Sequence, residues 1–160
     1  MTTDQIIQIA MAFGGTLGFC LLFNLPKRRI FLASLGGAVC WFIYLAGIRF
    51  GFDIFLASFF SSMFAGAYGE ILARICKAPT TVFFIPAVVP LIPGSSLYNT
   101  MISVLRQEAA LSRQYGIETL KFTLGISLGL SLMLAIDHFH HNISVRRKLR
   151  REKREAKKNA

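Results

Sequence analysis

Charged residues are scarce in this sequence: only 16% of its 160 residues are Asp, Glu, Lys or Arg, whereas 54% are hydrophobic. The mean hydropathy is +0.53. A soluble domain carries more charge, and a disordered chain has far fewer apolar residues. The composition therefore argues against a soluble enzyme and against a disordered protein. It indicates a small protein that crosses a membrane several times.

Residue sets for catalysis or metal binding are also missing from the apolar segments. The sequence has no paired carboxylates there, no Ser/His/Asp set and no HExxH motif. The three cysteines (Cys20, Cys40 and Cys76) have no CxxC or Cys/His spacing, so we interpret them as packing residues. We expect no enzyme, no cofactor and no metal. One polar group is interpreted as an interfacial cap rather than as haem or metal ligands: Asp137, His138, His140 and His141.

The net charge of +10 is concentrated at the C-terminus. Residues 146–160 hold nine of the 18 Lys and Arg residues and two of the eight acids, which leaves a net charge of only +3 on the other 145 residues. This pattern divides the chain into a transmembrane domain, residues 1–145, and a basic cytoplasmic tail, residues 146–160. The tail is predicted to contact anionic lipid headgroups. Its lack of aromatic residues argues against nucleic-acid binding.

A single helix needs roughly 20 apolar residues to cross a bilayer, and four apolar segments are predicted to cross in this way. Another segment, residues 80–97, is apolar but contains three prolines, so it cannot form one straight helix. We therefore expect an all-α polytopic integral membrane protein of about five transmembrane helices with a Pro-broken fourth span. The unbroken spans are predicted at residues 6–25, 30–48, 52–73 and 122–136.

The distribution of Lys and Arg predicts the orientation of these spans. With the N-terminus outside, the cytoplasmic segments contain 14 basic residues and the outer segments contain four. Cytoplasmic loops carry such an excess, so we expect five crossings with the C-terminus in the cytoplasm. The first basic residue is Lys27, and no cleavable signal peptide is expected because no basic region precedes the first span. These features predict a bacterial inner (plasma) membrane protein.

Small residues predict how the spans pack. The first and last spans each contain a GxxxG motif, at Gly14–Gly18 and Gly125–Gly129, which allows close approach of helices. The third span has two rows of small residues at four-residue spacing. The rows are Ser58, Ser62 and Gly66, and Ser61, Ala65 and Gly69. Because two small faces leave room for two neighbours, the third span is predicted to be the central helix.

The proline-rich segment is the most informative part of the sequence. Three prolines within eight residues predict a discontinuous span that faces an interior cavity, since freed backbone groups are tolerated there. Ser95 or Ser96 is predicted to be the N-cap of a following half-helix, whose N-terminus would suit a carboxylate. The alternative is a proline-kinked helix that ends in a turn near the outer surface. The candidate substrate-pathway residues are Pro86, Pro90, Pro93, Gly94, Ser95, Ser96, Tyr98 and Asn99.

The segment from Phe83 to Tyr98, FFIPAVVPLIPGSSLY, resembles the core of the threonine/serine exporter family. The length and the five apolar segments resemble that family's small C-terminal-type module, here in the form of a separate chain. The resemblance implies export of small amino acids or small organic acids, driven by an ion gradient. In that family the small module is fused to a larger membrane module or works with one as a separate chain, so the resemblance also implies a larger partner chain of the same family.

Glu70 is the clearest ionisable residue inside a predicted span. Intramembrane charges are costly, so they mark candidate functional sites. Glu70 is either a proton or cation site near the cytoplasmic mouth, or one half of an i,i+4 pair with Arg74 at a helix end. The sequence favours neither. Residues 101–118 are predicted to form an amphipathic helix that either continues the fourth span outward or lies on the outer surface, and that ends at Gly116.

Two functions are compatible with the sequence. The first is a subunit of a secondary exporter for threonine, serine or small carboxylic acids such as dicarboxylates, completed by a larger partner chain or by a homo-oligomer. The second is an accessory or scaffolding inner-membrane protein without a transport pathway of its own. The broken span and Glu70 favour the exporter, whereas the small size and the many small-residue motifs suit the scaffold.

Overall fold

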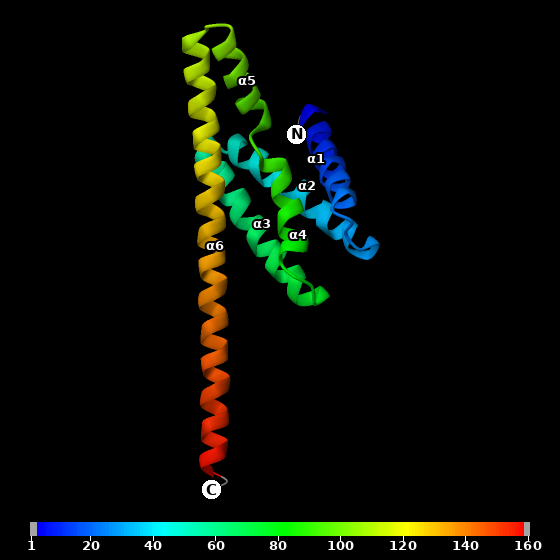
Figure 1. Ribbon diagram of the computed structural model, residues 1–160, viewed down its shortest axis with the longest axis vertical. Coiled ribbons are helices and arrows are strands. Elements are labelled where there is room, and N and C mark those ends of the chain that lie inside the picture. The colour runs from blue at the N-terminus through cyan, green and yellow to red at the C-terminus, as the bar shows by residue number, and fades with distance from the viewer. Residues whose placement is uncertain (1–2, 159–160) are drawn as a thin grey trace.

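The structure is a computed structural model that describes the backbone of residues 3–158 and the side chains of residues 3–139. All regular structure in this part of the chain is helical, as expected (Figure 1). The elements are α1 (Thr3–Leu22), α2 (Lys27–Arg49), α3 (Ile54–Cys76), α4 (Thr81–Val88), the 3₁₀ helix η1 (Val89–Leu91), α5 (Gly94–Leu105) and α6 (Ala109–Lys158). The side chains of His140, His141 and the basic tail lie outside the described residues.

Four helices are long and apolar enough to cross a membrane: α1, α2, α3 and residues 109–139 of α6. A fifth crossing is provided if α4, η1 and α5 are counted as one bent span, with an angle of 44° between its two halves. In Figure 1 α5 continues away from the α3–α4 loop instead of turning back toward it. The segment is therefore a broken crossing, and the predicted multi-pass architecture with a Pro-broken fourth span is confirmed.

Helix α3 is the central helix of the fold, as its small residues predicted. It packs against α2, α4 and α6. Its contact with α6 is close because Gly125 and Gly129 face it: a Cβ atom at either glycine would collide with the hydroxyl group of Ser58 or Ser62 and with nearby α3 backbone. The GxxxG motif of the last span is thus a packing motif between α3 and α6.

Hydroxyl groups fill the centre of the bundle. Ser58, Ser61 and Ser62 are fully buried. Ser58 donates to the carbonyl of Ile54 at 2.8 Å, and Ser61 donates across the helix interface to the carbonyl of Cys40 at 2.5 Å. These bonds satisfy polar groups that would otherwise be costly in an apolar interior.

The cysteines behave as the sequence indicated. Cys20 and Cys40 are free thiols with no exposed surface, packed in the two apolar clusters of the bundle. Cys76 is free and half-buried at the end of α3. Packing, rather than redox chemistry, accounts for the two fully buried thiols.

Two expectations about glycines are wrong. A Cβ atom at Gly14 or Gly18 would meet nothing within 4 Å, so the GxxxG motif of α1 makes no close contact inside the described part of the chain. Gly116 does not end a helix, because α6 runs through it and begins at Ala109. The actual break lies just before α6, where Gln107 has a positive φ of 58°. Gly116 instead faces Thr100 of α5, at an ordinary van der Waals distance for an added Cβ atom.

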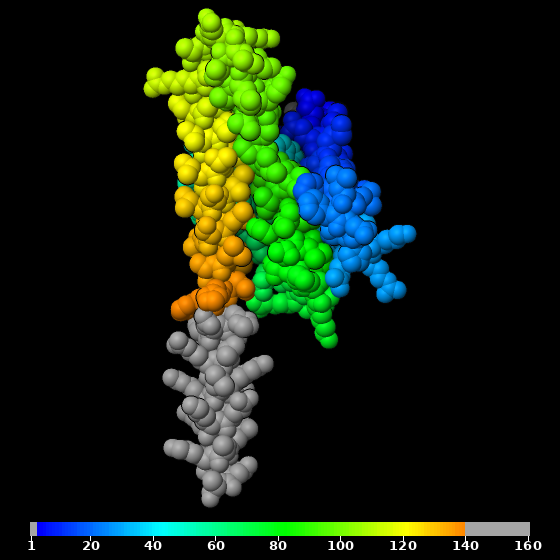
Figure 2. All heavy atoms as spheres, viewed as in Figure 1, coloured from blue at the N-terminus to red at the C-terminus, as the bar shows by residue number. Residues whose placement is uncertain are grey.

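Helix α5 and the first turns of α6 form an antiparallel hairpin, residues 94–120. In Figures 1 and 2 this hairpin projects beyond the ends of α1, α2 and α3, on the side where the N-terminus lies. The rest of the bundle, which we call the body, contains α1–α4, η1 and the part of α6 that packs on α3. The hairpin and the body are continuous through α6.

Candidate functional site

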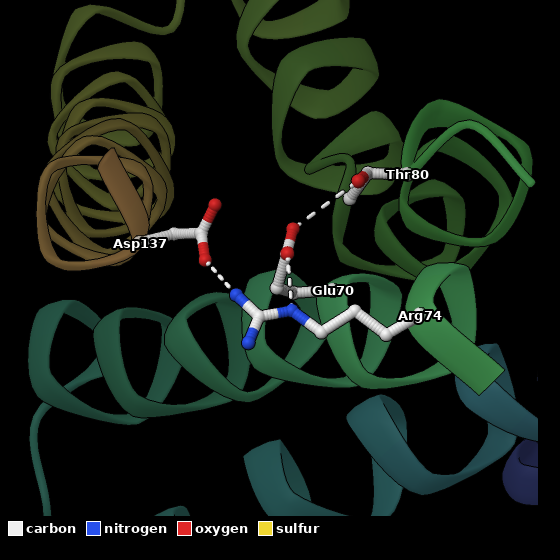
Figure 3. Close-up of polar contacts among 4 residues, drawn as sticks. All are labelled: Glu70, Arg74, Thr80 and Asp137. Atoms are coloured by element: carbon white, nitrogen blue, oxygen red, sulfur yellow. Dashed lines mark hydrogen bonds and ion pairs between the residues drawn. The ribbon is translucent and has the colours of Figure 1, made fainter. Parts of the chain in front are cut away.

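A polar junction joins three elements at the end of the body opposite the hairpin (Figure 3). It contains Glu70 and Arg74 of α3, Thr80 at the start of α4 and Asp137 of α6. Arg74 donates from Nε to Glu70 Oε1 at 2.8 Å and from Nη2 to Asp137 Oδ1 at 2.6 Å. Thr80 Oγ1 donates to Glu70 Oε2 at 3.2 Å.

Local sequence explains how the junction forms. Glu70 and Arg74 are four residues apart, so they share one face of α3 near its C-terminus, where a positive charge is favourable. Lys77 then takes a left-handed conformation with φ 48° and turns the chain toward Thr80. The long α6 brings Asp137 to the same level from 63 residues away.

The junction carries a charge imbalance. Its hydrogen-bonded set contains two carboxylates and one guanidinium, which sum to one negative charge when all three are ionised. Glu70 and Asp137 keep only 21% and 27% of their side-chain surface exposed, so both carboxylates are partly withdrawn from water. A proton, a metal cation or a ligand ammonium group would neutralise the set.

A groove of about 200 Å³ lies beside these charges. Glu70, Arg74 and Asp137 line it together with apolar residues of α3 and α6: Ala67, Ile71, Met133 and Ile136. A groove with a few convergent charged groups on an apolar wall is typical of small-molecule and ion sites. The arrangement can bind a small cation or zwitterion between α3 and α6.

The proline motif forms the second candidate region. Pro86 lies inside α4, Pro90 lies in η1, and Pro93 precedes α5 with φ −75°. The inner half of the motif is packed in the bundle, since Pro86 and Leu91 are fully buried. The prolines therefore break the span where it leaves the core.

Two expectations about the second half of the motif are wrong. One is the N-cap at Ser95 or Ser96, and the other is that this half faces a cavity inside the chain. Pro93, rather than Ser95 or Ser96, is the N-cap of α5, and no side-chain hydrogen bond caps this helix. The exposed positions of this half-helix, Ser95 and Tyr98 among them, lie on the outside of the chain and not toward its interior. Tyr98 is 63% exposed. These side chains are exposed because α5 extends beyond the body, where no other helix in the described part of the chain covers this face of α5.

The structure does not bring Glu70 and the second half of the motif together. Thr80, which bonds Glu70, precedes α4, whereas Gly94 and Asn99 belong to α5. The 11 residues from Thr81 to Leu91 separate them, which is about 16 Å of helix. The two candidate regions therefore lie at opposite ends of α4.

Sequence reasoning missed two features of these regions. The sequence places Asp137 in an interfacial cap, but in the structure it bonds Arg74. Trp41, the only tryptophan, lies in mid-α2, away from the span ends where tryptophan is enriched. Its Nε1 atom is buried and has no hydrogen-bond partner in the described part of the chain. Trp41 lines a groove of about 300 Å³ with Pro90 of η1 and Gln8 of α1.

A family model described as "Threonine/Serine exporter, ThrE" matches residues 8–136, which include the proline motif, Glu70, Arg74 and Thr80 of the polar junction and most of the bundle. The chain belongs to the threonine/serine exporter family. This confirms the resemblance seen in residues 83–98 and makes the chain a multi-pass component of a membrane exporter. No solved structure matches the chain.

Proposed function

We propose that this exporter component carries threonine, serine or small carboxylic acids such as dicarboxylates out of the cell, driven by an ion gradient. The single observation that supports this proposal most strongly is the polar junction, because it holds a surplus negative charge beside a groove in a transporter-family chain. The proposed location is a bacterial inner membrane, with the N-terminus outside and the C-terminus in the cytoplasm, as the distribution of basic residues favours.

Glu70 is the proposed coupling residue. Arg74 is shared between Glu70 and Asp137, so the two carboxylates compete for one guanidinium. A proton or cation on Glu70 makes the junction neutral and releases Arg74 to Asp137 alone. Binding at Glu70 therefore changes how tightly α3, α4 and α6 are held together, which is the kind of rearrangement that alternating access needs.

Pro86, Pro90, Pro93, Gly94, Ser95, Ser96, Tyr98 and Asn99 are the proposed substrate pathway. The span is broken at this point, and irregular backbone at membrane depth is stable only inside protein or beside water. Because the second half of the motif is exposed in the single chain, a second polypeptide must cover it. We propose that this cover is a larger membrane protein of the same family or another copy of the chain.

Flux measurements in proteoliposomes test the proposal. The chain alone and the chain with a co-purified larger family member are compared, with labelled threonine, serine and succinate under an imposed proton gradient. Flux that requires the partner supports a two-component exporter, and flux by the chain alone supports a homo-oligomer. If neither folded preparation moves any of these substrates, the exporter proposal is wrong.

The second candidate function is an accessory or scaffolding protein, favoured by the many helix-packing glycines. Single cysteines at positions 95, 96 and 99 separate the two functions. A substrate pathway predicts reaction with water-soluble thiol reagents and protection by substrate. A scaffold predicts that added substrate leaves the reaction rates unchanged.

A further inference from the structure

The body and the hairpin lie at different depths along the bundle. Two ion pairs mark the two ends of the body. Asp53–Lys121 and Asp137–Arg74 both join α3 to α6. On α6 they are 16 residues apart, which is about 24 Å of helix, close to the roughly 30 Å thickness of a bilayer's hydrocarbon core. The two pairs therefore lie near the two faces of the apolar layer, with the body between them.

The hairpin lies beyond the outer of these pairs. Helix α6 begins at Ala109, 12 residues before Lys121, so it extends about 18 Å past the Asp53–Lys121 pair. Helix α5 packs along this extension, with Thr100 against Gly116. Figure 2 shows the far end of the hairpin standing clear of the body, whereas its base lies beside the end of α1. With the outer ion pair at the face of the apolar layer, the far end of the hairpin lies beyond the lipid tails.

The hairpin nevertheless exposes large apolar side chains. A row on α5 is more than half exposed: Leu97, Tyr98, Met101, Val104 and Leu105. The positions recur at intervals of three and four residues, which is the pattern of a seam that packs against another helix. Exposed apolar rows of this kind on a surface outside the lipid mark a protein interface.

We propose that a second copy of this chain covers the α5 row, so that two hairpins form a four-helix bundle outside the apolar layer. The charge pattern favours a second copy. The hairpin carries Arg106, Glu108, Arg113 and Glu118, which are two charges of each sign. A two-fold contact between neutral surfaces of mixed sign avoids like-charge repulsion, whereas a hairpin shaped for an oppositely charged partner would carry one sign.

The same contact would cover one residue of the proposed substrate pathway. This step rests on the proposed function, in which Ser95, Ser96, Tyr98 and Asn99 line the pathway. Of these residues only Tyr98 belongs to the α5 row, so a second copy placed on the row covers Tyr98, whereas Ser95, Ser96 and Asn99 lie on other faces of the helix.

Thiol cross-linking in liposomes that contain only this chain tests the contact. Met101→Cys is compared with Leu128→Cys, because Met101 and Leu128 are both more than half exposed but Leu128 lies on α6 between the two ion pairs. A short bis-maleimide is expected to give covalent dimers with Met101→Cys and only the wild-type background with Leu128→Cys. The absence of dimers with Met101→Cys, in protein of normal helicity, overturns the proposal.

The oligomeric state in nanodiscs provides the second measurement. The wild type is expected to be a dimer, and Met101→Glu is expected to lower the dimer population at least tenfold. Gln107→Glu, which adds the same charge at the hairpin turn outside the row, is expected to remain dimeric. A monomeric wild type, or cross-linking of Met101→Cys in native membranes only to a chain of different mass, overturns the second-copy proposal. An intact dimer without flux contradicts the proposed function instead.

Discussion

Both ends of α3 are tied to α6 by an ion pair, but the two pairs differ in charge balance and surroundings. At the outer end, Asp53 and Lys121 pair one to one at 3.0 Å, and both side chains are about half exposed. At the inner end, Arg74 serves both Asp137 and Glu70, beside a groove and with a surplus negative charge. The outer pair is neutral and exposed, so it marks depth and adds little stability. The inner set, which consists of Glu70, Arg74 and Asp137, keeps one negative charge that a bound cation or a ligand ammonium group can neutralise.

The largest effect is expected when the carboxylate of Glu70 is removed from the inner set. Glu70→Gln keeps the size of the side chain but removes the surplus charge, so gradient-driven efflux of threonine and serine should fall to background in proteoliposomes. Asp53→Asn is the matched control, since it makes the same chemical change in the outer pair, and it should transport normally. Normal driven transport by well-expressed Glu70→Gln would show that Glu70 is only a structural partner of Arg74.

The next largest effect is expected at the guanidinium. Arg74→Gln leaves Glu70 and Asp137 without their shared cation, and driven flux should fall roughly tenfold, the ratio that corresponds to about 1.4 kcal/mol. Arg74→Lys keeps the charge but not the fork that bonds two carboxylates, so its flux should lie between Arg74→Gln and the wild type. Equal fluxes for Arg74→Lys and Arg74→Gln would show that charge at this position does not matter.

A third prediction concerns the packing that holds both ion pairs in register. Gly129→Ala forces a methyl group against Ser62 and the α3 backbone, so it should destabilise the chain by about 1–3 kcal/mol in thermal unfolding followed by circular dichroism. Gly14→Ala adds the same methyl group where nothing lies within 4 Å, and it should be neutral or stabilising. Similar losses in both variants would contradict the close contact between α3 and α6.

The smallest effect is expected at the outer pair. The hydrogen bond from Lys121 holds the pKa of Asp53 below its ordinary value. A carboxyl with a lowered pKa in the folded state adds stability above its ordinary pKa of about 4, and this stability is lost as pH falls through the lowered value. The difference in unfolding temperature between wild type and Asp53→Asn should therefore be small at neutral pH and vanish in acid. A difference that grows on acidification would contradict this pairing.

Features set by local sequence could be predicted well. The spans follow from apolar length, the break follows from three prolines, and the central place of α3 follows from small residues at four-residue spacing. The Glu70–Arg74 pair is also local, because i,i+4 residues share a helix face. Each of these depends on backbone geometry within one or two helical turns.

Features set by the path of the chain could not be predicted in the same way. The Arg74–Asp137 bond joins residues 63 positions apart, and no spacing rule indicates it. The exposure of Tyr98 depends on where α5 leaves the body, which is a property of the whole bundle. Ser95 and Ser96 are good N-cap residues by type, but the helix already begins at Gly94, with Pro93 as its N-cap.

Glu70, in the inner set, is proposed to couple substrate movement to ion movement, and this coupling can be measured directly. Ion entry and labelled threonine exchange are recorded together in proteoliposomes, with a proton gradient and with a sodium gradient in turn. We expect that Glu70→Gln still exchanges threonine across the membrane but that substrate no longer drives ion movement in either gradient. Undiminished substrate-driven ion movement in Glu70→Gln would contradict the coupling role of this carboxylate.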